Sequence, residues 1–232
     1  MKTLLQHPAF WLALTVGAYL LADWLFHRSR RFPLLHPVFV AAMLLIALLK
    51  LTGTSYAQYM SSAYIIHLLL GPATVALAIP LFANLARVRE LLLPLMIALL
   101  IGGLTAIGSV IAFGYLFGLT PEVLVSFAPK SVTTPIAMAL ADRLGGNASI
   151  AAAAVMVTGV FGAMIAETLL RVLRIRDDAV KGFAIGITSH GTGTARAFQI
   201  SPTAGAFSGL GMGLNGVLTS LCLPLILTLW PV

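Results

Sequence analysis

Long apolar stretches separated by short polar loops dominate the hydrophobic pattern of this chain of 232 residues. Most of the stretches reach the ~20 residues that a helix needs to cross the hydrocarbon core of a bilayer. We therefore expect an all-α polytopic membrane protein with about 6–8 membrane segments. The apolar runs span residues 8–26, 36–52, 62–83, 91–118, 121–143, 148–172, 179–200 and 204–230.

Three of these runs carry breaks. Run 62–83 contains Gly71-Pro72 and Pro80, so we expect it to be kinked or broken. The break in run 121–143 consists of Pro129, Lys130, Ser131, Val132, Thr133, Thr134 and Pro135. The break in run 179–200 consists of Ser189, His190, Gly191, Thr192, Gly193, Thr194, Ala195 and Arg196. Broken backbone at membrane depth must be buried in protein or line a cavity, so we expect two interrupted helices or re-entrant hairpins with facing breaks.

The two breaks also contain helix-start signals. Thr134 followed by Pro135 predicts a helix start, with a hydroxyl cap and proline in the first position. Thr194 predicts a second start, and Gly191 and Gly193 would let the chain turn there and approach a ligand closely. Helix N-termini carry unpaired N–H groups and partial positive charge, which favour anions.

Cations and hydroxyl groups surround these predicted helix starts, and neither motif contains an acidic residue. We therefore expect a receptor for a small anion. The predicted substrate-binding residues are Lys130, Ser131, Thr133, Thr134, His190, Thr192, Thr194, Arg196 and Asn215. The predicted helix-breaking residues are Pro129, Pro135, Gly191 and Gly193.

Several of these residues have a structural alternative. Lys130 would reach the interface and pair with Glu122, and Arg196 would only set the topology. His190 would be a hydrogen-bonded core residue, and Asn215 would only bond a neighbouring helix.

Other polar residues have a stronger structural interpretation. His67 lies near Gly71-Pro72 and is expected to be structural. Glu167 lies four residues before Arg171, which favours a helix salt bridge over a proton relay. Gly205, Gly209 and Gly213 favour close helix contact within one subunit, with a homo-oligomer interface as the alternative.

The composition excludes a soluble domain, because 59% of the residues are hydrophobic and only 9% are charged. The net charge of +7 comes mainly from short loops, which indicates topology signals beside anionic lipid rather than nucleic-acid binding. The single cysteine allows no intrachain disulfide. The sequence shows no metal-ligand cluster, phosphate-cradling loop or nucleophile triad, so we expect neither an enzyme nor a cofactor or metal.

The positive-inside rule places the basic loops 28–31, 87–89 and 171–181 in the cytoplasm. These positions agree with one another if 121–143 enters and leaves by one face, with the N-terminus outside. We expect one integral membrane domain, 1–232, with N-terminal helices in 1–118. Segments 121–172 and 179–230 are a candidate inverted repeat, with Thr134 falling on Thr194 at an offset of sixty, although chance similarity is the alternative.

With these residues in hand, the chain resembles the LrgB/CidB family over most of its length. The resemblance begins near Arg31-Phe32-Pro33-Leu34-Leu35-His36-Pro37 and includes the loop Arg174-Ile175-Arg176. Its most specific parts are residues 129–137 and 189–196. The resemblance implies two functional descriptions. One is antiholin-like control of murein hydrolase export and lysis. The other is small-monocarboxylate transport, because the plant plastid glycolate/glycerate transporter resembles a fusion of an LrgA-like and an LrgB-like part and bacterial relatives are linked to pyruvate uptake.

A holin-like pore has no need for a lysine and an arginine at two helix breaks, whereas a carboxylate carrier does. We therefore expect a transporter of glycolate-, glycerate- or pyruvate-like acids in the bacterial cytoplasmic (inner) membrane, with the holin/antiholin-like role as the alternative. The resemblance implies a separate LrgA/CidA-like membrane protein as partner.

Overall fold

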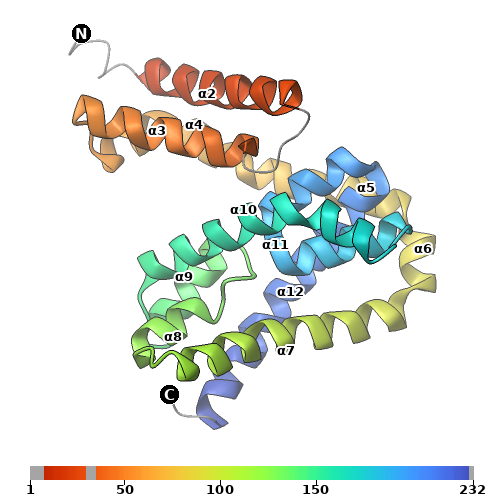
Figure 1. Ribbon diagram of the computed structural model, residues 1–232. Helices are drawn as coiled ribbons and strands as arrows, with labels where there is room; N and C mark the ends of the chain where they lie inside the picture. Colours follow the sequence, from red (N-terminus) through yellow and green to blue (C-terminus); the bar gives the residue numbers. More distant parts are fainter. Residues whose placement is uncertain (1–7, 30–34, 230–232) are drawn as a thin grey trace. The chain divides into compact units, whose positions relative to one another are not determined.

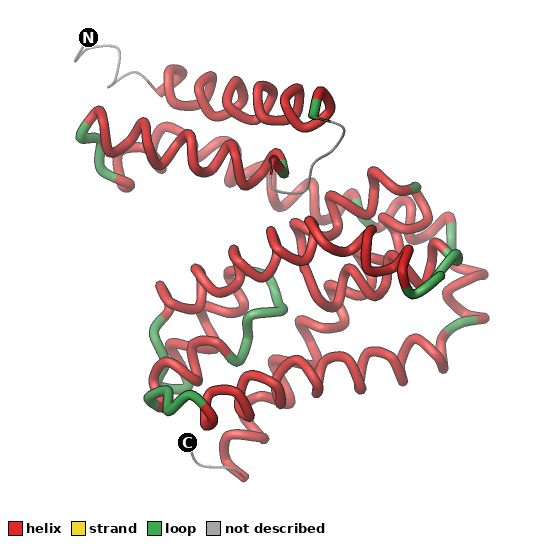
Figure 2. The backbone as a smooth tube through the Cα atoms, viewed as in Figure 1, coloured by secondary structure: helices red, strands yellow, loops and turns green. Residues whose placement is uncertain are grey.

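The computed structural model describes residues 8–29 and 35–229 as helices joined by turns and loops, with no strand among them (Figures 1 and 2). Arg30 and the first part of the family motif, 31–34, lie outside the described residues. The chain forms two compact units, Met1–Leu77 and Ala78–Val232, called unit 1 and unit 2. The helices are α2 (Pro8–Arg28), α3 (Pro37–Thr52), α4 (Tyr56–Ala76), α5 (Ala78–Ala83), α6 (Leu85–Glu90), α7 (Leu92–Leu116), α8 (Pro121–Phe127), α9 (Thr134–Arg143), α10 (Ala148–Val172), α11 (Asp178–Ile200) and α12 (Pro202–Leu229).

Within the described residues, four helices are long and apolar enough to cross a membrane, and a fifth span is added if one bent helix pair is counted. They are Ala9–Arg28, Leu92–Leu116, Ala148–Val172 and Pro202–Leu229. The expected all-α, multi-pass membrane architecture is therefore confirmed. The expected count of about 6–8 segments stays a prediction. The four helices are unbroken spans, and interrupted segments such as α8–α9 and α11 are not counted among them.

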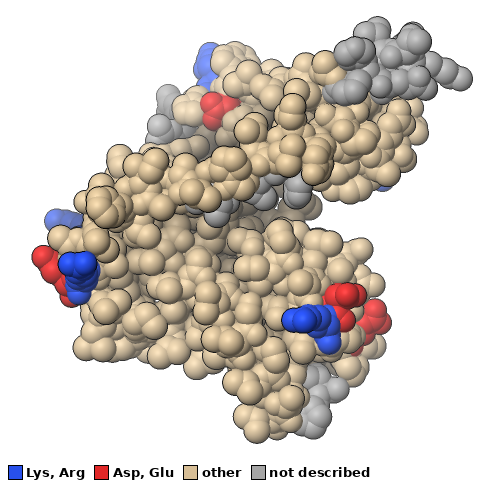
Figure 3. Space-filling view, turned by 180° about the vertical axis from the view of Figure 1, so that it is seen from behind, with Lys and Arg blue, Asp and Glu red and all other residues tan. Residues whose placement is uncertain are grey.

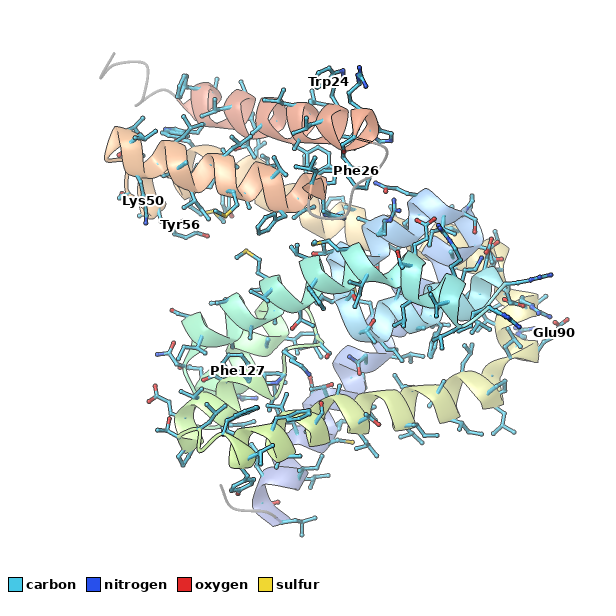
Figure 4. The ribbon with its side chains drawn as sticks, viewed as in Figure 1. Trp24, Phe26, Lys50, Tyr56, Glu90 and Phe127 are labelled. Carbon is cyan, nitrogen blue, oxygen red and sulfur yellow. The ribbon has the colours of Figure 1, made fainter. Side chains whose placement is uncertain are left out.

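In unit 1, α2 packs against α3 and α4. Trp11 of α2 is fully buried and meets the ring of Tyr59 edge-on at 5.8 Å between centroids. Figure 4 shows Phe26 between α2 and α3, where it is buried, and Trp24 on the outer face of α2. The predicted break in run 62–83 is confirmed, but Pro72 lies inside α4 and the helix ends only at Ala76.

Unit 2 contains a first helical hairpin, formed by α8, the loop 128–133 and α9 (Figure 2). The chain leaves α8 near Ser126 and returns to it after α9, because the Ser126 hydroxyl accepts a 2.7 Å hydrogen bond from the backbone N–H of Asn147. Gly146 permits this approach, since a Cβ there would lie 3.0 Å from the Ser126 backbone nitrogen. Asn147 then caps α10 by accepting bonds from the N–H groups of Ser149 and Ile150.

A second hairpin lies within α11, which breaks at His190 and turns back. Its two ends meet, because Lys181 near its start and Ile200 at its end line the same cavity. We call the segments 178–189 and 191–200 its outgoing and returning limbs. The sequence prediction of interrupted helices or hairpins at 121–143 and 179–200 is therefore confirmed for both segments.

The outgoing limb of α11 runs parallel to α12 at very short range. A Cβ on Gly182 would lie 2.0 Å from the carbonyl oxygen of Ala204, and one on Gly186 would lie 2.1 Å from that of Ser208. Small residues on both helices therefore allow backbone-to-backbone contact.

The glycines that the sequence assigned to close contact on α12 behave differently from one another. Gly205 is pressed against the ring of Phe198, as expected, whereas a Cβ on Gly213 would have no neighbour within 4 Å. The predicted face is therefore wrong at Gly213, because Gly211 instead packs against Phe183. The oligomer alternative stays untested.

Helix α10 fixes the two hairpins at opposite ends of unit 2, because one hairpin closes at its start and the other opens just after its end. The end near α11 also holds α6, where Arg87 pairs with Asp177 at 3.0 Å. Figure 4 shows Glu90 at this end of α7 and Phe127 at the other. Two of the predicted cytoplasmic loops therefore lie at the same end of the unit.

Candidate functional site

The first break separates α8 from α9. Pro129 and Val132 are almost fully buried, so protein rather than lipid surrounds this non-helical backbone. Helix α9 begins at Thr134 with Thr133 as its N-cap, and the Thr133 side chain makes no capping hydrogen bond. The predicted cap at Thr134 is thus wrong by one residue, while Pro135 lies in the first turn as expected.

Lys130 reaches from this break to the middle of α7. Its Nζ donates a 3.2 Å hydrogen bond to the carbonyl oxygen of Ala106. An ammonium group has three N–H donors, so two remain for other acceptors. The described residues show no ion pair between Lys130 and Glu122, so the first structural alternative for this lysine is not found.

The second break centres on His190, whose backbone has φ 42° and ψ −135°. Such a conformation costs a non-glycine residue about 1–3 kcal/mol and persists only when the surroundings impose it. The sequence assigned the turn to Gly191 and Gly193, which is wrong, because neither has a positive φ. The His190 ring is held by a 2.9 Å hydrogen bond from Nε2–H to the carbonyl oxygen of Val155 on α10.

Glycines on α10 make this placement of the second break feasible. A Cβ on Gly159 would lie 2.4 Å from the His190 ring, and one on Gly162 would lie 2.0 Å from the Ser189 hydroxyl. Gly193 has the same role within the hairpin, because its Cβ would lie 2.5 Å from that of Ser189.

Asn215 on α12 connects the first break to the outgoing limb of α11, just before the second break. Its Nδ2 donates to the carbonyl oxygen of Ser131 at 3.2 Å and to that of Ile187 at 3.1 Å. Asn215 is 1% exposed, and its Oδ1 has no hydrogen-bond partner among the described residues. The idea that Asn215 bonds a neighbouring helix is therefore correct, and the prediction that the two breaks face each other stays a prediction.

The hydroxyl groups of the second break are used in different ways. Thr194 lies inside the returning limb, so the predicted helix start at Thr194 is wrong. Its Oγ1 donates to the carbonyl oxygen of His190 and contacts the Ser208 hydroxyl, both at 2.9 Å. Thr192 lies close to α10, where a Cβ on Gly159 would approach its hydroxyl to 3.1 Å.

Arg196 lies six residues after His190, about 9 Å further along the returning limb. It is buried, and its guanidinium pairs with Glu167 on α10 and donates to Gln199 at 2.6 Å. Glu167 also holds Arg171 at 3.2 Å, which is the helix salt bridge that the sequence favoured. An anion-binding role for Arg196 stays a prediction, because its charge already faces a carboxylate.

Sequence reasoning missed several partners of this site. The carbonyl groups of Ala106 and Val155 carry no sequence signal, and neither does the Arg196–Glu167 pair across 29 residues. The glycines of α10 were a usable signal, because small residues in a spanning helix indicate close approach.

The fold and the site define a multi-pass helical membrane protein with two opposed helical hairpins. Residues 15–229 match the LrgB-like family, so the chain belongs to that family. No solved structure matches the chain.

Several curated relatives span nearly the same length. The protein YxaC of Bacillus subtilis is 37% identical over 94% of each chain. The antiholin-like protein LrgB of the same species is 30% identical over 96% of each chain. The holin-like protein CidB of Staphylococcus epidermidis is 30% identical over 85% of this chain and 86% of its own.

Proposed function

We propose that this protein acts in the bacterial cytoplasmic membrane as a holin-like or antiholin-like protein. This interpretation rests on the names of the LrgB and CidB relatives, which favour it over carboxylate transport. Deletion of the gene tests the proposal in cells. We expect altered release of murein hydrolase activity and altered lysis. An unchanged lysis rate in the deletion strain would remove this proposal.

At the molecular level we propose that the protein passes small monocarboxylates, such as glycolate-, glycerate- or pyruvate-like acids. One observation carries this second proposal: Asn215 holds the break of the first hairpin against the second hairpin, two residues before its break. Paired broken helices at membrane depth are the usual setting of a transporter binding site. The N-terminus of α9 and the ammonium group of Lys130 would attract an anion to the first break.

The residues near the breaks suit a compact carboxylate better than a large solute. Lys130 and Thr133 offer donors, and the nearby rings of Phe127 and Phe198 are each more than a third exposed instead of forming an enclosed aromatic box. Large apolar or cationic solutes would find no favourable contacts there. By family resemblance, an LrgA/CidA-like membrane protein is the partner that we propose for this activity.

Reconstitution separates a carrier from a pore. We expect proteoliposomes containing the protein, with and without an LrgA-like partner, to take up labelled glycolate or pyruvate with saturable kinetics. Unlabelled small 2-oxo and 2-hydroxy acids should compete with the labelled solute. If sugars and cations pass as readily as glycolate, without saturation, the carrier proposal fails and the holin-like pore remains.

A further inference from the structure

A cavity lies between the end of α10 and the two ends of the α11 hairpin. It lies at the ends of the hairpin rather than at its turn, and has a volume of about 180 Å³. It combines charged and apolar walls. The lining residues are Glu167, Leu170, Arg171, Ile175, Lys181 and Ile200.

The charges at this cavity do not balance. The Glu167 carboxylate faces two guanidinium groups, those of Arg171 and Arg196. The Lys181 ammonium pairs with Asp178 at 2.7 Å. These three cations therefore face two carboxylates, which leaves one positive charge in excess. Anions would be attracted to this position.

Arg171 is the cation best placed to meet an external anion. Its side chain is 75% exposed, whereas the side chain of Arg196 is 8% exposed. A guanidinium group offers five N–H donors in a planar fork, so Arg171 can keep one bond to Glu167 and bind phosphate oxygens with others.

The position of the cavity selects the source of the anion. Arg171 lies in the last turn of α10, a helix long enough to cross the membrane, so the cavity lies at the depth of the lipid headgroups. Leu170, Ile175 and Ile200 provide apolar walls against which the glycerol and upper acyl chain of a lipid would pack. In the space-filling view of Figure 3, the charged side chains likewise gather in separate clusters on a largely uncharged face.

We propose that this cavity binds the phosphate headgroup of an anionic phospholipid, at the membrane face that carries the basic loops. Basic pockets between membrane helices are a known way of binding such headgroups. The cavity shares Arg196 with the second break through its pair with Glu167, but its binding of a headgroup does not depend on either proposed function.

Native mass spectrometry of the purified protein tests the proposal with phosphatidylglycerol as the probe and phosphatidylcholine as the comparison. We expect the wild-type protein to retain phosphatidylglycerol preferentially. Arg171→Gln should weaken this binding at least about tenfold, because it removes a charge-assisted hydrogen bond. Folding should survive, since Glu167 keeps Arg196 as its partner; circular dichroism checks this.

Arg176→Gln is the matched control, because Arg176 is an exposed arginine of the adjacent loop that does not line the cavity. It should leave lipid binding unchanged. Equal losses in both variants would show general surface attraction and overturn the site. Equal retention of phosphatidylcholine, or displacement of the lipid by inorganic phosphate at millimolar concentration, would overturn the lipid assignment.

If Arg171→Gln does not fold, Arg171→Lys should still reduce lipid binding, because lysine lacks the planar fork of donors. Unchanged binding in this variant would contradict the proposal.

Discussion

The Nδ2 atom of Asn215 lies 3.2 Å from the carbonyl oxygen of Ser131, 84 residues earlier in the chain. The same nitrogen also donates to Ile187, at the end of the outgoing limb of α11. Asn215 thus satisfies one backbone acceptor from each broken segment. Buried polar groups of this kind hold a structure in one arrangement because each needs its partner.

Replacement of Asn215 by leucine should destabilise the protein. The substitution keeps the volume but leaves two buried carbonyl groups without their donor, at about 1–3 kcal/mol for each unsatisfied group. Thermal unfolding in detergent, followed by circular dichroism, measures the loss. Ser220→Ala is the control, because the Ser220 hydroxyl donates to the carbonyl oxygen of Gly216 in its own helix. A variant at Asn215 that is as stable as this control would contradict the bridging role.

Close packing of α11 on α12 gives a second prediction. Gly186→Ala places a Cβ 2.1 Å from the carbonyl oxygen of Ser208. This separation is too short for a real contact, so the helices must move apart. We expect a loss of about 1–3 kcal/mol of stability. Gly213→Ala, with no neighbour within 4 Å, should be neutral or more stable by about 0.5–1 kcal/mol. Equal melting temperatures for the two variants would refute the parallel contact.

The pairing of Arg87 with Asp177 predicts the membrane topology of unit 2. Single cysteines at positions 89 and 176, in a Cys222→Ser background, should react from the same face, which the positive-inside rule makes cytoplasmic. A cysteine at position 142, at the end of α9 and just before α10, should react from the opposite face. Labelling with an impermeant thiol reagent in intact cells measures this. Reaction at 142 and 176 from one face would contradict the opposed hairpins.

Acid should weaken the contacts of Asp178 at the ends of the second hairpin. Hydrogen bonds from Lys181 and Ser201 hold the pKa of Asp178 below its ordinary value of 3.8. A lowered folded-state pKa contributes stability above the unfolded value, and that stability is lost as the pH falls through the folded-state pKa. We therefore expect Lys181→Gln to reduce the loss of stability between about pH 5 and pH 2. Thermal unfolding measured across this pH range checks the prediction, and equal acid losses in the wild-type and Lys181→Gln proteins would contradict it.

Much of this architecture follows from the sequence pattern. The apolar runs predict the helices within a few residues, because spanning length and hydropathy constrain them strongly. Pro129 and Pro135 locate the first break, since proline removes backbone donors. The second break was found from its glycines, but the backbone turn falls on His190, whose strained conformation depends on contacts with α10.

The partners of the site residues could not be read from the sequence. Lys130 and Arg196 look alike as cations at two breaks, yet one reaches a backbone carbonyl of α7 and the other a carboxylate of α10. This difference arises from the packing of the returning limb, which brings Glu167 and Arg196 together. The sequence indicates which residue types lie at a break, whereas tertiary contacts decide which of those charges already have an ion-pair partner.

Binding of a small carboxylate to the purified protein tests the central claim most directly, through Lys130→Met. Methionine keeps the apolar stem, and Ala106 loses only one hydrogen bond from a lysine, so the fold should persist. Isothermal titration with glycolate and pyruvate, including any partner protein that binding requires, gives the affinities. We predict saturable binding to the wild-type protein and at least about tenfold weaker binding to Lys130→Met, because a hydrogen bond to a charged group contributes about 1.5–3 kcal/mol. Equal affinity in the two folded proteins would contradict the assignment of an anion site to the two breaks.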